Sequence, residues 1–202
     1  HMQKGTPYIY QGEEIGMTNV VFDSIDEYND IELLNMYKER ISEGYKEEDI
    51  MKSIYAKGRD NARTPMQWDD SLNGGFSKVK PWLKVNPNYV DINVKNNLEY
   101  ENSIFNHYKK LIKIRKNEDV VVYGDFKLFY KDHNSIFSYI RELNDEKILV
   151  VANFYDKDEE FVLDKSIKYE SCEILLSNYK DSSENIEKIN LRPYEAIIYK
   201  LK

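Results

Sequence analysis

From about residue 119 onward the chain consists of short β-prone runs separated by turns, and this pattern constrains the fold more than any other feature. The separating segments are rich in Asp, Asn and Gly, which favour tight turns. Seven short runs at this spacing predict an antiparallel Greek-key β-sandwich over residues 119–202. The expected strands are residues 120–123, 126–130, 136–143, 147–154, 160–163, 173–176 and 196–201.

Before residue 119, one β-prone run is followed by helix-like segments. Tyr8-Ile9-Tyr10 leads directly into Gly-Glu-Glu, as a barrel strand does where it delivers side chains to a functional rim. Gly58 is expected to end a helix over residues 47–57, and Ser103 to cap a helix that runs to Lys116. The first helix is predicted by the apolar stripe Ile50, Met51, Ile54 and Tyr55, and the second by residues at the spacings of one face, Ile104, Phe105, Tyr108, Leu111, Ile112 and Arg115.

A further helix is expected to end at Gly44, with Ile31, Leu34 and Ile41 on one face. Either of two capping boxes could begin this helix, Ser24 with Glu27 or Asn29 with Glu32.

Residues 58–100 contain three prolines and the pair Gly74-Gly75, so a long ordered loop is expected there. A connection of this length is unusual in a compact domain unless it has a function. Trp68 and Trp82 are expected to anchor the loop to a barrel, although tryptophans can also stack on sugar rings.

Composition narrows the partners and the compartment. The net charge is -7 and no Lys/Arg-rich block is present, which argues against a nucleic-acid or anionic-membrane partner. No apolar run approaches the roughly 20 residues that span a bilayer. With the lone Cys172 and no secretory leader, we expect a cytoplasmic protein. His1-Met2 is interpreted as a short addition from cloning ahead of a piece cut from a longer protein.

The run Arg59-Asp60-Asn61-Ala62-Arg63 is the strongest candidate for binding chemistry. It supplies two guanidinium groups around one carboxylate, and guanidinium groups hold hydroxyls and carboxylates in fixed orientation. The alternative, an ion-pair network that pins the loop, stays open at this point. Glu13 and Glu14 cannot serve as a catalytic pair, because adjacent residues of an extended segment point in opposite directions. We expect one to pair with an arginine and the other to face water. No cysteine or histidine cluster, acidic calcium loop or phosphate-binding loop is present, so the sequence supports no metal or cofactor site.

Several segments together resemble the oligo-1,6-glucosidase branch of glycoside hydrolase family thirteen. They are residues 5–17, 24–28, 30–32, 58–68, 82–89, 92–94 and 191–196. The resemblance implies an α+β fragment. Residues 1–118 would be the last strand, the long loop and the last helix of a (β/α)8 barrel, and residues 119–202 the appended sandwich.

The resemblance also implies roles for individual residues. Arg59 matches the arginine that reaches the sugar in the non-reducing-end pocket, and Glu32 matches an acid near the neighbouring acceptor position. Glu32 can equally be the third-position acid of the Asn29 capping box. Asp60 and Arg63 would then steady Arg59. The three catalytic acids of the family, and any structural calcium, would lie upstream, so no residue of this chain is expected to be catalytic.

The resemblance implies a longer protein that is a retaining exo-α-glucosidase acting on α-1,6 bonds at the non-reducing end of isomalto-oligosaccharides. Trehalose-6-phosphate hydrolase, dextran glucosidase and sucrose isomerase remain alternatives within the family. An alternative of another class is a non-catalytic carbohydrate-binding or structural sandwich module. The chain alone is expected to be inactive, and either to self-associate through its uncovered apolar surface or to keep residues 1–100 partly disordered.

Overall fold

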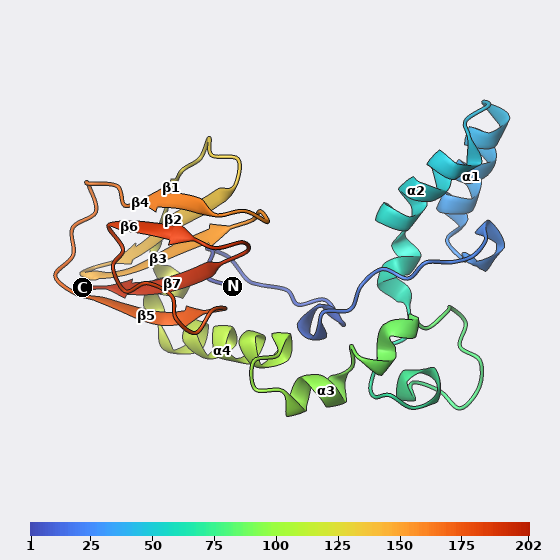
Figure 1. Cartoon of the computed structure of the whole chain (residues 1–202), viewed down its shortest axis with the longest axis horizontal. Helices are drawn as coiled ribbons and strands as arrows, with labels where there is room; N and C mark the ends of the chain where they lie inside the picture. The colour runs from blue at the N-terminus through green and yellow to red at the C-terminus, as the bar shows by residue number, and fades with distance from the viewer. The chain divides into compact units, whose positions relative to one another are not determined.

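The computed structural model describes residues 1–202 and divides them into two compact units (Figure 1). The first, called here the sheet unit, comprises residues 1–8 and 107–202, and the second, the loop unit, comprises residues 9–106. These units follow physical contacts, whereas the boundary predicted at residue 118 follows the change in sequence pattern.

The sheet unit contains a five-stranded antiparallel sheet and a separate antiparallel pair. The five strands lie in the order β1-β2-β3-β7-β5, and β4 pairs with β6. The strands are β1 Asp125–Phe129, β2 Ile136–Leu143, β3 Glu146–Asn153, β4 Glu159–Val162, β5 Cys172–Ser177, β6 Lys188–Leu191 and β7 Ala196–Leu201.

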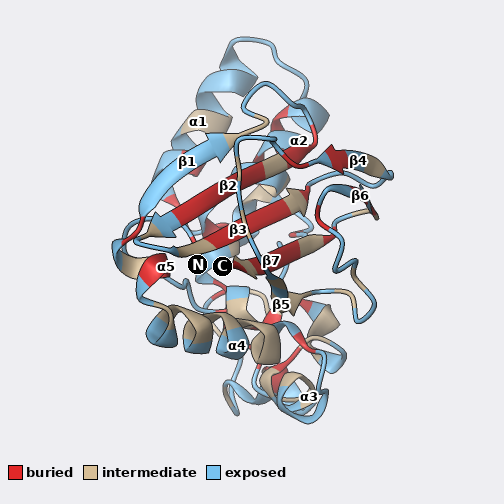
Figure 2. Ribbon diagram, turned by 90° about the vertical axis from the view of Figure 1, so that its left-hand side faces the viewer, coloured by how far each residue is buried: buried red, intermediate tan, exposed pale blue.

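Both faces of the central strands are buried. One face packs against Phe161 of β4 and Ile189 and Leu191 of β6, which makes the two-layered sandwich that the spacing of the short β-prone runs predicts. The other face packs against the helix α5 (Asp119–Tyr123) and against Leu111 and Ile114 of the helix α4 (Ile104–Asn117). Figure 2 accordingly shows much of β2, β3 and β7 as buried, whereas the edge strand β1 is mainly exposed.

Two expectations for the sheet unit are wrong. Residues 120–123 form helix α5 instead of a strand, because Val120 and Val121 gain complete burial against the sheet. The strand β6 was not expected, since only two of its four residues are buried. Met2 is 2% exposed and packs with Val120 and Val121, so it belongs to this core.

The loop unit is built mainly from helices and short 3-10 turns. Residues 58–100 are not one irregular loop but contain several of these elements. The helices are α1 Ile31–Ser42, α2 Glu47–Lys57 and α3 Val94–Glu99, together with the start of α4. The 3-10 turns are η1 Glu13–Ile15, η2 Ile25–Glu27, η3 Arg59–Arg63, η4 Leu72–Gly75 and η5 Pro87–Val90. As expected, Ser103 caps α4, since its Oγ accepts a hydrogen bond from the Asn106 N–H at 3.2 Å.

Helices α1 and α2 pack on a small core with Val20, Phe22, Tyr28 and Leu83. The predicted stripe of α2 is confirmed, with Ile50, Met51 and Ile54 buried. The predicted face of α1 is wrong, because Leu33 is buried whereas Ile31 and Ile41 are exposed.

Neither predicted capping box begins α1. Asp30 is its N-cap, and the Asp30 side chain accepts a hydrogen bond from the Glu32 N–H. The Ser24 side chain makes no capping hydrogen bond to η2, and Glu27 instead accepts from the Asp23 N–H at 2.9 Å.

Tyr8-Ile9-Tyr10 forms no strand, and all three side chains are exposed. A strand requires neighbours for its backbone N–H and C=O groups, and this run has none here. Trp68 and Trp82 are also exposed in this chain. No helix combines the length and the apolar character needed to cross a bilayer.

Candidate functional site

Arg59 occupies the position where helix α2 ends and the turn η3 begins. The Gly58 N–H closes α2 by donating to the Ile54 carbonyl at 2.7 Å. A side chain at Gly58 would meet that same carbonyl oxygen at 2.7 Å and Leu33 Cδ1 at 3.0 Å. Glycine is therefore required here by close packing rather than by an unusual backbone angle, and it lets the chain turn tightly before Arg59.

The Arg59 guanidinium is held by Asp30 in a two-pronged ion pair. Arg59 Nε donates to Asp30 Oδ2 at 2.7 Å, and Arg59 Nη2 donates to Asp30 Oδ1 at 2.7 Å. These hydrogen bonds from Arg59 lower the pKa of the Asp30 carboxyl to about 2, and the pairing raises the pKa of Arg59. Because Asp30 is buried and Arg59 is half exposed, the pair fixes the guanidinium while leaving part of it open to solvent.

Glu32 completes the exposed part of this arrangement. Its Oε2 lies 2.6 Å from Arg59 Nη2, and its side chain is 77% exposed. Glu32 stands in the first turn of α1, immediately after the Asp30 cap. The structure thus brings together the two residues predicted to contact substrate, and Glu32 does not act as the acid of an Asn29 capping box.

Asp60 and Arg63 both contact Asp30, the partner of Arg59. Asp60 is 1% exposed, and its Oδ2 accepts hydrogen bonds from the backbone N–H groups of Asn29 at 2.7 Å and of Asp30 at 2.9 Å. Arg63 Nη1 lies 3.2 Å from Asp60 Oδ1 and 3.8 Å from Asp30 Oδ2. Asp60 and Arg63 therefore act on Arg59 through Asp30, which is one step more remote than the sequence suggested.

Asp30 is the residue that sequence reasoning missed. Its burial and its contact with Arg59 depend on two segments that are 29 positions apart. The available signal was an aspartate directly before an apolar-periodic helix, which marks an N-cap but does not reveal an arginine partner.

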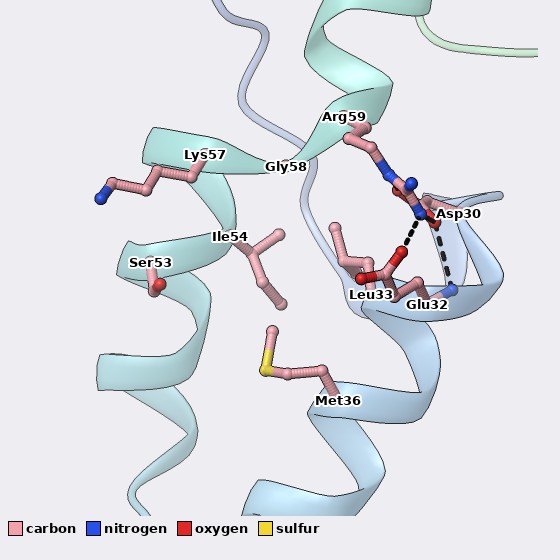
Figure 3. A pocket seen from close by; sticks show the side chains of 9 residues that line it. All are labelled: Asp30, Glu32, Leu33, Met36, Ser53, Ile54, Lys57, Gly58 and Arg59. Carbon is pink, nitrogen blue, oxygen red and sulfur yellow. Dashed lines mark hydrogen bonds and ion pairs between the residues drawn. The ribbon is translucent and has the colours of Figure 1, made fainter.

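A cavity of about 250 Å³ adjoins the Arg59–Glu32 pair. It lies between α1 and α2, and Figure 3 shows Met36 and Ile54 pointing toward each other across it. Asp30, Glu32 and Arg59 gather at one end. The residues that line it are Asp30, Glu32, Leu33, Met36, Ser53, Ile54, Lys57, Gly58 and Arg59.

A second cavity, of about 490 Å³, also includes Arg59 in its lining. Its other walls come from the segments 10–13, 17–19 and 56–64. The Tyr10 hydroxyl donates to the Ala62 carbonyl at 3.0 Å, which ties the first of these segments to η3. Arg59 therefore lies where two hollows of the loop unit adjoin.

The remaining candidates have structural partners. Glu13 accepts from the Tyr10 N–H at 3.1 Å and Glu14 from the Gly12 N–H at 2.7 Å, so each carboxylate bonds to the backbone of its own turn. His133 Nδ1 accepts from the N–H groups of Ser135 and Ile136, which fixes its orientation. No group of three or more His, Cys, Asp or Glu residues is arranged to hold a metal ion.

Comparison with known proteins identifies the family. The family model described as alpha amylase, catalytic domain, matches residues 1–124, and the alpha-amylase SusG C-terminal domain matches residues 136–198. The chain belongs to the α-amylase family. It therefore carries part of the catalytic domain followed by the C-terminal β domain, as the resemblance to glycoside hydrolase family thirteen implied.

The relatives are mainly glucosidases. The chain is 57% identical to an oligo-1,6-glucosidase of Bacillus cereus and 46% identical to a trehalose-6-phosphate hydrolase of Bacillus subtilis, over its whole length in both cases. The solved trehalose-6-phosphate hydrolase of Bacillus licheniformis matches 99% of the chain with a TM-score of 0.95 and 44% identity. In each comparison the chain spans 36% of the relative's length.

Proposed function

We propose that the longer protein containing this chain is a retaining exo-α-glucosidase that hydrolyses α-1,6 bonds at the non-reducing end of isomalto-oligosaccharides. The observation that carries the proposal is the Arg59–Glu32 pair, in which a half-exposed guanidinium is held rigidly next to an exposed carboxylate. Identities of 54–57% to three oligo-1,6-glucosidases support the choice of bond.

The geometry suits recognition of sugar hydroxyls. Asp30 and Glu32 engage Arg59 Nε and Nη2, and these contacts do not use Nη1. Nη1 carries two N–H donors, and Glu32 offers acceptor oxygens beside them. A pair of hydroxyls can therefore be held by one donor and one acceptor of fixed orientation. Because Asp30 fixes the guanidinium before substrate arrives, little side-chain entropy is lost on binding.

Bond cleavage must come from residues that this chain does not supply. Retention requires two carboxyl groups roughly 5 to 5.5 Å apart, one as nucleophile and one as acid and base. Glu13 and Glu14 bond to backbone N–H groups instead. The proposal assigns the catalytic acids to the part of the catalytic domain outside these 202 residues, and expects the isolated chain to be inactive.

The function is tested with the full-length protein and a panel of isomaltose, trehalose 6-phosphate, sucrose and a chromogenic α-glucoside. Isomaltose is expected to be cleaved most efficiently, with release of α-glucose. Arg59→Lys is expected to lower kcat/KM for isomaltose about 10- to 100-fold, because the planar fork and its paired hydrogen bonds to Asp30 are lost. Arg40→Lys is the matched control, since Arg40 is another exposed, ion-paired arginine on the nearby helix α1. The proposal fails if isomaltose is not cleaved.

Trehalose-6-phosphate hydrolase is the second candidate. The TM-score of 0.95 with the solved Bacillus licheniformis enzyme supports it. Preference for trehalose 6-phosphate over isomaltose in the same panel would establish this candidate instead.

A purely carbohydrate-binding role for the sheet unit is less well supported. The central strands bury apolar residues on both faces, so the sheet presents no open aromatic face for a sugar. This arrangement favours a structural cap on the catalytic domain.

The isolated chain is proposed to self-associate, and the full-length protein to be cytoplasmic. No residue of α4 is fully buried, and Ile104 at its start is 47% exposed. Sedimentation velocity should show a mass that rises with concentration and falls back in Ile104→Lys. Cell fractionation tests the compartment.

A further inference from the structure

The core that packs α5 and part of α4 against the sheet is already a contact between two domains. Its residues Met2, Val120 and Val121 lie in the segment that matches the α-amylase catalytic domain, whereas Tyr139 and Ile148 lie in the segment that matches the C-terminal domain. Residues of the catalytic domain therefore cover one face of the sheet. This cover stops short of the edge strand β1, which Figure 2 shows as mainly exposed beside the buried stretch of β2.

The uncovered part of this face begins beside Tyr139. In the antiparallel pair β1–β2, Leu128 lies opposite Tyr139, and residues that lie opposite each other point to the same face of a sheet. The centre of the Phe126 ring lies 5.0 Å from that of Tyr139. Leu128 and Phe126 therefore extend the apolar face onto β1, yet each of them is 40% exposed.

Aromatic rings lead from Tyr139 to a cavity of about 500 Å³. The Phe137 ring centre lies 5.3 Å from that of Tyr139 and 6.2 Å from that of Phe154. Phe137 and Phe154 line the cavity together with Leu128 and Gln3. The volume equals roughly 17 water molecules at about 30 Å³ each, whereas packed protein leaves few voids larger than one water. We call Phe126, Leu128, Phe137 and Phe154 the corner surface.

We infer that in the full-length protein the corner surface is covered by the part of the catalytic domain that leads into residue 1, which places apolar side chains in the cavity. Gln3 borders the cavity and belongs to the segment that matches the catalytic domain, so the corner surface continues an interface that this domain already makes. The chain spans 36% of the length of its relatives, so the full-length protein has further sequence to supply the cover. The inference rests on the family and not on the proposed reaction.

His1, two residues before Gln3, also lacks a neighbour. Its Nδ1 is buried and has no hydrogen-bond partner, although the His1 carbonyl accepts from Arg115 Nη1 at 2.7 Å. A buried polar atom without a partner is costly and rare in folded proteins. A segment of the catalytic domain packed at this place can supply that partner.

The shape of the corner surface favours side chains over a sugar. The rings of Phe137 and Phe154 are inclined at 75° to each other, so they form two walls of a corner and not a flat platform on which a pyranose could stack. Phe154 is 63% exposed, which leaves one wall of the corner open to an incoming apolar side chain.

The test measures how fast single cysteines react with a water-soluble maleimide in the full-length protein, after Cys172 and any other native cysteine are replaced by alanine. The thiol of Phe154→Cys is expected to react about 100-fold more slowly than that of Val162→Cys, because it reacts only when the interface opens. Val162→Cys is the matched control, since Val162 is 46% exposed and lies in β4, which packs on the opposite face of the sheet. Leu128→Cys should also react slowly and decides the matter if Phe154→Cys fails to fold.

Slow labelling at either corner position, in dilute protein without sugar, supports the inference. Labelling as fast as in Val162→Cys overturns it and leaves the proposed function unaffected. Protection that appears only as the protein concentration rises assigns the corner surface to a second copy of the protein, and protection that requires isomaltose assigns it to a sugar. Either of these results also overturns the inference.

Discussion

The two units of this chain differ in whether their own residues complete their cores. The sheet unit buries both faces of its central strands with residues 1–8 and 107–202. The loop unit leaves large side chains such as Tyr10, Trp68 and Trp82 exposed. The chain spans 36% of the length of its relatives, so we expect the exposed side chains of the loop unit to contact further parts of the catalytic domain in the full-length protein.

Native probes allow the units to be followed separately. Both tryptophans, Trp68 and Trp82, lie in the loop unit, and the single cysteine, Cys172, lies in β5 of the sheet unit. Tryptophan fluorescence therefore reports unfolding of the loop unit, and the reactivity of the Cys172 thiol reports opening of the sheet unit.

The largest expected effect is at Arg141 in the sheet unit. Arg141 is fully buried and donates to the carbonyl groups of Met2 at 2.9 Å, Val121 at 2.5 Å, Gly124 at 2.6 Å and Asp125 at 3.1 Å. Arg141→Met leaves these buried acceptors without donors, so we expect a loss of about 3–5 kcal/mol in the free energy of unfolding. Urea unfolding followed by Cys172 reactivity measures it.

The control for Arg141 is Arg115, which also binds backbone carbonyls of the first residues but is only partly buried. Arg115→Met should cost clearly less, because water can satisfy the carbonyls it leaves. Equal losses of stability in the two variants would contradict the view that burial increases the cost of leaving carbonyl groups without hydrogen-bond donors.

The next effect is at Gly58 in the loop unit. An added methyl group would lie 2.7 Å from the Ile54 carbonyl oxygen, and backbone cannot move away as a side-chain end does. Gly58→Ala is expected to lower the stability of the loop unit by about 2 kcal/mol, measured by tryptophan fluorescence in urea. Gly44→Ala serves for comparison, because Gly44 has open space around it but a φ of 87°. This substitution should lower the stability of the loop unit by only about 1 kcal/mol. The packing argument is wrong if Gly44→Ala proves the more damaging change.

The sequence predicted the elements that depend on interactions between neighbouring residues, and it failed for those that depend on contacts between distant residues. The bounds of α2, β2 and β7 were predicted residue for residue, because strong local periodicity and punctuation such as Gly58 determine them. Residues 120–123 were misassigned, because burial against the sheet overrides the β preference of three valines and a tyrosine in sequence.

For the site, the sequence identified Arg59 and Glu32 but not their connection through Asp30. That connection depends on a buried carboxylate that caps one helix and binds an arginine beyond the next helix. Local patterns carry no record of such a contact. The functional roles of Arg59 and Glu32 stay predictions.

A smaller effect is expected when the loop unit is acidified, because protonation of Asp30 breaks its ion pair with Arg59. The folded pKa of Asp30, about 2, lies below its ordinary value of 3.8. The contribution of the Asp30–Arg59 ion pair to the free energy of unfolding is therefore complete above about pH 4 and is lost as the pH falls through about 2. We expect it to be about 1 kcal/mol, since water screens the half-exposed Arg59. Asp30→Asn should remove this part of the acid dependence of tryptophan fluorescence. An unchanged acid transition in Asp30→Asn would show that other carboxylates dominate it.

The smallest expected effect returns to the sheet unit, where Tyr194 is strained. Tyr194 has a φ of 55°, in the left-handed region, and its side chain is exposed. The turn is fixed by its neighbours, because Arg192 Nε and Nη2 bind the carboxylate of Glu195 at 3.0 and 2.8 Å. Tyr194→Gly removes about 1–2 kcal/mol of strain but adds about 0.5–1 kcal/mol of backbone entropy cost, so a net gain of roughly 0.5 kcal/mol is expected.

Tyr155→Gly is the control for Tyr194, because Tyr155 is another exposed tyrosine of the sheet unit and its φ is not positive. It should lose stability, since it carries the entropy cost with no strain to relieve. A complete core tolerates strain such as that at Tyr194 because the surrounding contacts leave the turn no alternative. If both glycine variants lose stability equally in urea, the sheet unit stores no strain at Tyr194. The sheet unit would then differ from the loop unit only in how completely its core is buried.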